Sequence, residues 1–140
     1  MIKDWNDPKY CLVTVKQYGY ALEYVKEQTH EICLEAVKEN GLALKFVKDQ
    51  TSEMCFEAVK QNGFALEYVK EQTPEMCLQA IKQNGCAFEH VKEQTPLIIH
   101  YLKKYNISIY ESFKKENRIT ISDNEMKKFY NENPHLLLTL

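Results

Sequence analysis

The sequence predicts an all-α protein, an α-solenoid of stacked short antiparallel helix pairs with a C-terminal capping helix. Three observations predict this fold class: glycine, threonine and cysteine recur every 22 residues, each 22-residue unit carries two helix signals, and a last helical segment departs from the repeat. A unit of this size cannot bury an apolar face alone, so successive units must stack on one another.

The repeat is clearest in two adjacent units. Gly41–Asn62 reads GLALKFVKDQTSEMCFEAVKQN and Gly63–Asn84 reads GFALEYVKEQTPEMCLQAIKQN, and they agree at 14 of 22 positions. The array extends in weaker form over residues 7–116, between an N-terminal cap at 1–6 and a capping helix with an apolar tail at 117–140. The recurring structural positions are Gly19, Gly41, Gly63 and Gly85, Thr29, Thr51, Thr73 and Thr95, and Cys11, Cys33, Cys55 and Cys77.

The first helix of each unit is predicted from its ends. In Thr73-Pro74-Glu75 the threonine accepts a bond from a free amide, proline suits the first helical position, and the carboxylate favours the helix N-terminus. The apolar residues of Met76–Ile81 then form one stripe, and Asn84-Gly85 is expected to end the helix in a left-handed conformation. This pattern predicts helices near residues 8–17, 30–39, 52–61, 74–83 and 96–105.

The second helix of each unit is short. Ala65–Lys70 makes about two turns, and a helix of this length forms only when it packs against neighbours. Equivalent helices are expected near residues 20–27, 42–49, 64–71, 86–93 and 108–116.

Both ends of the array depart from the repeat. In residues 96–105 the apolar stripe is expected to rotate toward Ile98, Ile99, Leu102 and Tyr105. Ser122–Glu125 has the spacing of a capping box and predicts the final helix. Ile2, Trp5 and Tyr10 are expected to cover the first unit, and Leu136–Leu140 either folds back over the cap or meets a second subunit.

The repeated motif resembles tandem repeats in proteins of amoeba-infecting giant DNA viruses. It is also similar to an uncharacterised repeat family of bacteria and protists whose core reads AVKQNGxAL, here Ala58–Leu66, and Ala36–Leu44 with Glu39 in place of glutamine. The resemblance covers about residues 7–116. It implies a repeat fold and a viral origin, and it implies no enzymatic activity.

Composition excludes several classes of protein. The 18 basic and 20 acidic residues leave a net charge of −2, which argues against binding nucleic acid by phosphate neutralisation. No apolar stretch approaches the length of a membrane span, and the first nine residues are too polar for a secretion signal. We therefore expect a cytoplasmic protein, in the host cytoplasm if the origin is viral, with no membrane or nucleic-acid partner.

No catalytic, metal or cofactor site is predicted. The repeated cysteines occupy one position in successive units, about 8–10 Å apart as stacked helices are, which is too far for a disulfide. They are expected to fill helix contacts. Cys86 departs from that position and is the one candidate for a reactive thiol. The histidines His30, His90, His100 and His135 have no ligand spacing.

Polar and aromatic rows are the candidate functional features. The candidate partner-binding residues are Lys26, Lys48, Lys70 and Lys92 with the aromatic row Tyr24, Phe46 and Tyr68, which His90 continues. Each lysine precedes an acidic residue, so a solvated charged face is the alternative. The aromatic row either packs in the core or lines a groove.

Two further rows have a structural interpretation. Gln28, Gln50, Gln72 and Gln94 recur in register, as do Asn40, Asn62, Asn84 and Asn106. Both rows are expected to form hydrogen bonds between neighbouring units. The first functional hypothesis is a non-catalytic scaffold that binds an unidentified protein. The second is a self-assembling structural protein, a homodimer through its terminal apolar residues.

Overall fold

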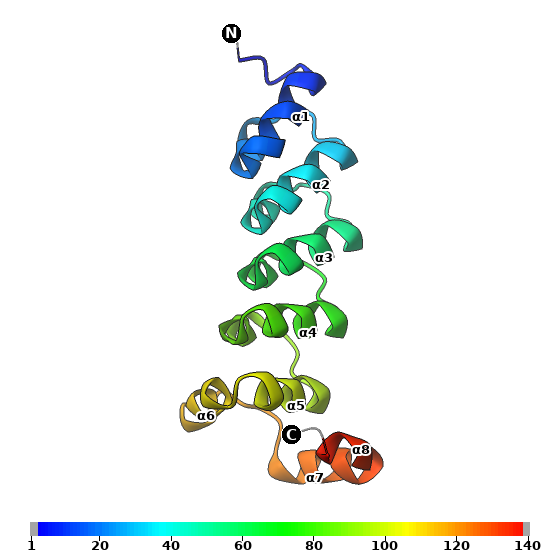
Figure 1. Ribbon diagram of the computed structural model, residues 1–140, viewed down its shortest axis with the longest axis vertical. Helices are drawn as coiled ribbons and strands as arrows, with labels where there is room; N and C mark the ends of the chain where they lie inside the picture. Colours follow the sequence, from blue (N-terminus) through cyan, green and yellow to red (C-terminus); the bar gives the residue numbers. More distant parts are fainter. Residues whose placement is uncertain (1–2, 139–140) are drawn as a thin grey trace.

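The computed structural model describes residues 3–138, which form an elongated stack of helices (Figure 1). The α-helices are α1 (Pro8–Gln17), α2 (His30–Glu39), α3 (Ser52–Gln61), α4 (Pro74–Gln83), α5 (Pro96–Tyr105), α6 (Ile107–Lys115), α7 (Asp123–Glu132) and α8 (Pro134–Leu137). The 3-10 helices are η1 (Gly19–Tyr24), η2 (Gly41–Phe46), η3 (Gly63–Tyr68) and η4 (Gly85–His90). No strand occurs within the described residues, so the all-α repeat fold is confirmed.

The five predicted long helices coincide with α1 to α5. Each of α2 to α5 begins where its threonine side chain accepts a hydrogen bond from the third helical amide. The pairs are Thr29 with Ile32, Thr51 with Met54, Thr73 with Met76 and Thr95 with Ile98, at 3.2–3.3 Å. These caps satisfy amides that have no partner within the helix.

The second helices are shorter and tighter than predicted. In the first four units they are 3-10 helices of six residues that end at positions 24, 46, 68 and 90, three residues before the predicted ends. The next residue, a valine in each of these units, is extended and buried or half-buried. The chain leaves the helix at this valine because the following residues hydrogen-bond to the neighbouring unit. The fifth, predicted near residues 108–116, is the α-helix α6 and is confirmed.

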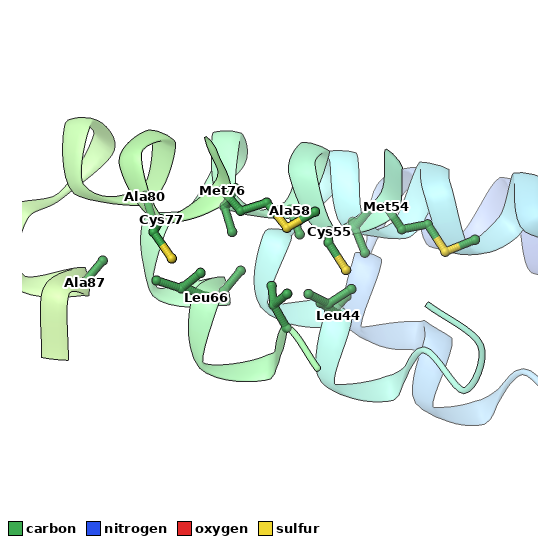
Figure 2. Close-up of a cluster of buried hydrophobic side chains, with 14 of the residues drawn as sticks. Leu44, Met54, Cys55, Ala58, Leu66, Met76, Cys77, Ala80 and Ala87 are labelled. Atoms are coloured by element: carbon green, nitrogen blue, oxygen red, sulfur yellow. The ribbon is translucent and has the colours of Figure 1, made fainter. Parts of the chain in front are cut away.

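Two layers of helices enclose one core. The α-helices stack on one another and the 3-10 helices stack beside them, and Figure 2 shows the buried side chains between the two layers. Ala58 and Leu66 are fully buried, and Cys55 is 4% exposed. The repeated cysteines therefore fill helix contacts, as predicted.

The predicted left-handed glycine stop is wrong. None of the four glycines has a positive φ, and the helix ends at an extended asparagine, Asn62 in the case of α3. Glycine is required here by close approach. A Cβ on Gly63 would lie 2.6 Å from the carbonyl oxygen of Ala80 in the following helix, α4. The Gly63 amide also donates to Gln83 Oε1 at 2.8 Å.

The last unit differs from the others. Ile98, Ile99 and Leu102 are buried as predicted, but Tyr105 is 42% exposed, so the buried stripe does not extend to Tyr105. His100 is fully buried instead, because α7 packs over it. The capping box of α7 is confirmed, with Ser122 accepting from the amide of Glu125 at 3.2 Å.

The two ends of the chain pack incompletely. Trp5 lies against Tyr10, with ring centroids 5.2 Å apart, while Ile2 falls outside the described residues. In the C-terminal tail Leu136 is half-buried, but Leu137 is 51% and Leu138 is 90% exposed. The tail therefore folds back only in part, and Thr139-Leu140 lies outside the described residues.

Candidate functional site

The segments 25–29, 47–51, 69–73 and 91–95 join each 3-10 helix to the next α-helix and form one edge of the stack, here called the loop edge. Glutamines hold this edge together. Gln50 Nε2 donates to the carbonyl of Tyr68 at 2.7 Å, and its Oε1 accepts from the amide of Lys70 at 3.1 Å. Gln28, Gln72 and Gln94 bridge to the following segment in the same way. The predicted glutamine ladder between units is thus confirmed.

The asparagine row does not form such a ladder. Asn62 Oδ1 accepts from the amide of Phe64 at 3.0 Å, two residues further along the same chain segment. Asn40 and Asn84 make the equivalent bonds to Leu42 and Cys86. These asparagines cap the 3-10 helices, because their extended backbone brings the side chain over the first free amides.

The lysine row is only partly free for a partner. Lys70 Nζ donates to the carbonyl of Lys48 at 3.3 Å, and Lys92 Nζ donates to the carbonyls of Val69 and Lys70 at 3.0 and 3.1 Å. These ammonium groups stabilise the stack. Within residues 3–138 the ammonium group of Lys48 and the carboxylate of Glu71 form no ion pair or hydrogen bond.

Three equivalent hollows lie between successive units along the loop edge. Their volumes are about 350, 280 and 310 Å³ in chain order. Each is lined by a threonine and a cysteine of one unit and by a lysine and an acidic residue of the next. These residues are Thr29, Cys33, Lys48 and Asp49 in the first, Thr51, Cys55, Lys70 and Glu71 in the second, and Thr73, Cys77, Lys92 and Glu93 in the third.

The thiols that line these hollows are expected to be unreactive. Burial raises the pKa of Cys77 to about 11, and burial together with the charge of Asp49 raises the pKa of Cys33 to about 11. Their thiols also donate to Gln72 and Gln28, at 3.6 Å each. A protonated thiol is neither a nucleophile nor a metal ligand. Within the described residues no three His, Cys, Asp or Glu side chains form a group that can hold a metal.

The aromatic row lies apart from the hollows, on the layer of 3-10 helices. Tyr24 is 57% exposed, whereas Phe46 and Tyr68 are half-buried. Phe46 packs edge-on against Tyr20 of the preceding unit at 5.8 Å, and Lys45 Nζ lies 4.9 Å from both ring centroids. Phe46 and Tyr68 therefore pack against the core and line none of the three hollows, whereas Tyr24 lines a separate hollow at the N-terminal end of the stack.

The odd cysteine and the histidines form no common site. Cys86 is exposed, as its departure from the repeat suggested. His30 is exposed at the start of α2, where its Nε2 lies 3.1 Å from Glu53 Oε2, and His90 packs edge-on against Phe64 at 6.1 Å. His100 is buried and hydrogen-bonds to Tyr130 in the C-terminal cap.

Sequence reasoning missed one functional feature of the stack. The residue before Asn40, Asn62 and Asn84 accepts a hydrogen bond from the glycine amide that begins the preceding 3-10 helix. Gln61 bonds Gly41 at 2.7 Å, and Glu39 bonds Gly19 at 2.5 Å. The signal was present, since this position is Glu or Gln in the units beginning at Gly19, Gly41 and Gly63.

The stacked two-layer units define the class of this protein, an α-solenoid of short helical repeats. Residues 29–72 and 51–104 match the model of the family described as Domain of unknown function (DUF4116). The matches overlap and together cover more than half of the chain, so the chain belongs to this family. No curated protein and no solved structure matches it. None of the helices formed by residues 3–138 has the length and apolarity of a membrane span.

Proposed function

We propose that this chain is a non-catalytic scaffold whose loop edge binds an extended segment of another protein. The observation that carries the proposal is the recurrence of one hollow per unit, three times in succession along the same edge. A solenoid offers such a repeated surface to an elongated partner. An extended polypeptide can place one side chain in each hollow.

Charge at the loop edge favours a partner with basic side chains. The ammonium groups of Lys70 and Lys92 are held by backbone carbonyls. The carboxylates of Asp49 and Glu71 line a hollow and form no ion pair within the described residues. Of the lysines that line the hollows, Lys48 is the one whose ammonium group forms no hydrogen bond or ion pair within residues 3–138, so it is available to an acidic group of the partner. Lys26 lies on the same edge, in segment 25–29, and is a secondary contact. The aromatic row lies apart from the three hollows and is not part of the proposed binding surface.

The same proposal includes origin and location. The motif resemblance to giant-virus repeats supports a viral origin, and a viral scaffold of this kind would act in the host cytoplasm. Membership of a family of unknown function is compatible with a protein that performs no catalysis.

Peptide display on the purified chain tests the proposal. Enriched peptides are synthesised with a fluorescent label, and their affinity is measured by anisotropy. The variant Asp49→Asn/Glu71→Gln removes two charges at the hollow without changing side-chain shape. We expect it to bind the enriched basic peptides at least about tenfold more weakly.

Glu57→Gln is the matched control, because Glu57 pairs with Lys60 on α3 and does not line a hollow. It should bind as the parent does. The proposal is wrong if no extended peptide is enriched, or if the double variant binds as tightly as the control.

A further inference from the structure

The N-terminal end of the stack carries an apolar hollow of about 470 Å³. We define the N-terminal face by five residues that line it, Trp5, Tyr10, Val13, Tyr18 and Tyr24. Trp5 bridges the hollow, with its ring 5.2 Å from that of Tyr10 and 5.3 Å from that of Tyr24. Val13 is 59% and Tyr18 is 68% exposed, so this end of the molecule presents apolar surface to water.

The N-terminal face occupies the repeat positions through which every later unit stacks on the unit before it. Tyr10 is half-buried, but the residues at its position in later units, Ile32, Met54, Met76 and Ile98, are at most 3% exposed. Gln17 occupies the position of Gln61, which accepts a hydrogen bond from the amide of Gly41 in the preceding 3-10 helix, η2. Within residues 3–138 no unit precedes the first, so this stacking surface is left open.

The sequence of this end is more apolar than that of the interior units. Val13 stands where Glu35, Glu57 and Gln79 stand, and Tyr18 stands where Asn40, Asn62 and Asn84 stand. Terminal units of solenoids ordinarily become more polar, because their outer face meets water. Here two polar positions have become apolar and exposed. Aromatic residues and few charges are the composition of the buried centre of a protein interface.

The opposite end is closed. Helix α7 covers α5 with the buried Met126 and exposes Lys127, Lys128 and Glu132 to water. Among the described residues, the exposed large apolar side chains at this end are Tyr105 and Ile107, at the junction of α5 and α6, and Leu137 and Leu138, in and beside the short α8. None of them belongs to α7, which covers the last stacked helix. The capped end therefore offers little surface that resembles a preceding unit.

Charge does not oppose the pairing of two N-terminal faces. Residues 3–24 contain three basic and three acidic side chains, Lys3, Lys9 and Lys16 with Asp4, Asp7 and Glu23, and their formal charges sum to zero. A face with no net charge can meet its own copy. A partner with a large net charge of one sign would gain no electrostatic attraction from this face.

We propose that the N-terminal face is a homodimer interface, in which two copies of this chain meet head to head and cover each other's open stacking surface. The contact is isologous, which means that both copies use the same patch, including Trp5, Val13 and Tyr18. The assembly therefore contains two chains and cannot grow further through this face. The loop edge lies elsewhere on the molecule. The failure of this proposal would therefore leave the proposed peptide binding untouched, and the reverse also holds.

Analytical ultracentrifugation over a concentration series tests the interface. We expect a mass that rises from 16.5 kDa to twice that value and then stays constant. Trp5 is the only tryptophan of the chain, so its emission should shift to shorter wavelength over the same concentrations. The variant Val13→Glu/Tyr18→Asn restores the residues of the interior units and should raise the dissociation constant at least about tenfold.

Tyr105→Gln is the matched control. It also replaces an exposed aromatic residue by the residue of interior units, but at the other end of the stack. It should dimerise as the parent does, and circular dichroism should show equal helix content in all variants. A parent that remains monomeric up to about 1 mM overturns the proposal. So does a dimer that survives in the double variant, or a mass that grows beyond two chains, since that indicates head-to-tail association.

Discussion

His100 Nδ1 lies 3.0 Å from the hydroxyl oxygen of Tyr130, and this hydrogen bond joins α5 to the capping helix α7. The imidazole is fully buried, and its Nε2 has no hydrogen-bond partner among residues 3–138. Its position is held by Leu12, Leu34, Phe56 and Leu78 in the other units. The capping helix α7 thus covers a titratable histidine at a position where the other units carry an apolar side chain.

The first prediction concerns pH. Burial lowers the pKa of His100 below its ordinary value of 6.5, and the charges of Lys104 and Lys103 lower it further. Below pH 6.5 the unfolded chain therefore binds a proton that the folded chain resists, and stability falls as pH falls. We expect urea unfolding of the parent to lose stability between pH 7.5 and 5.5 more steeply than His100→Leu. The difference is bounded by about 1.4 kcal/mol per pH unit.

His135 supplies the control for this experiment, because it is exposed at the start of α8. His135→Leu should leave the pH dependence of the parent unchanged. Equal slopes for the parent and His100→Leu would show that the buried imidazole does not govern the acid sensitivity of the cap.

The second prediction concerns the glutamine ladder. Gln50→Ala removes three hydrogen bonds, to the carbonyl of Tyr68, the amide of Lys70 and the thiol of Cys55. An unsatisfied buried polar group costs about 1–3 kcal/mol. We expect a loss of that order in the free energy of unfolding, measured in urea. Gln79→Ala, at a half-buried glutamine outside the ladder, should cost less than about 0.5 kcal/mol.

The third prediction separates two explanations for the repeated glycines. A Cβ on Gly63 would meet the Ala80 carbonyl, so Gly63→Ala should destabilise the chain by about 1–3 kcal/mol. Gly63→Asn should be at least as harmful, because it carries the same Cβ. If the asparagine variant unfolds at the same urea concentration as the parent, a left-handed backbone would explain the glycine better, because asparagine tolerates that conformation.

The fourth prediction concerns thiol reactivity. In the native protein at pH 8 we expect Ellman's reagent to modify Cys86 quickly. Cys33 and Cys77 should react only on unfolding, because burial shields them and raises their pKa to about 11. Cys86→Ser should abolish the fast phase. A fast phase that persists in this variant would show that a repeated cysteine is accessible in the native stack.

Much of the fold is predictable because its signals are local. A threonine cap acts over three residues, as in Thr73 and Met76, so the starts of the long helices can be found from the sequence alone. The capping box at Ser122 is local in the same sense. The candidate site was only partly predictable. The lysine and aromatic rows share one periodicity, and periodicity does not say that Lys70 bonds a carbonyl while Phe46 packs against Tyr20.

By itself the sequence determined the repeat, its 22-residue period, the positions of the long helices and the identity of the residues that recur. These follow from backbone propensities and from hydrogen bonds within a few residues. Only the tertiary structure decided why glycine recurs, where each lysine donates, that His100 is buried and that the first unit has an open face. Each of these depends on contacts between helices that are distant along the chain, such as that of Gly63 in η3 with Ala80 in α4. Distances between stacked helices set such contacts, and one-dimensional spacing along the chain does not contain them.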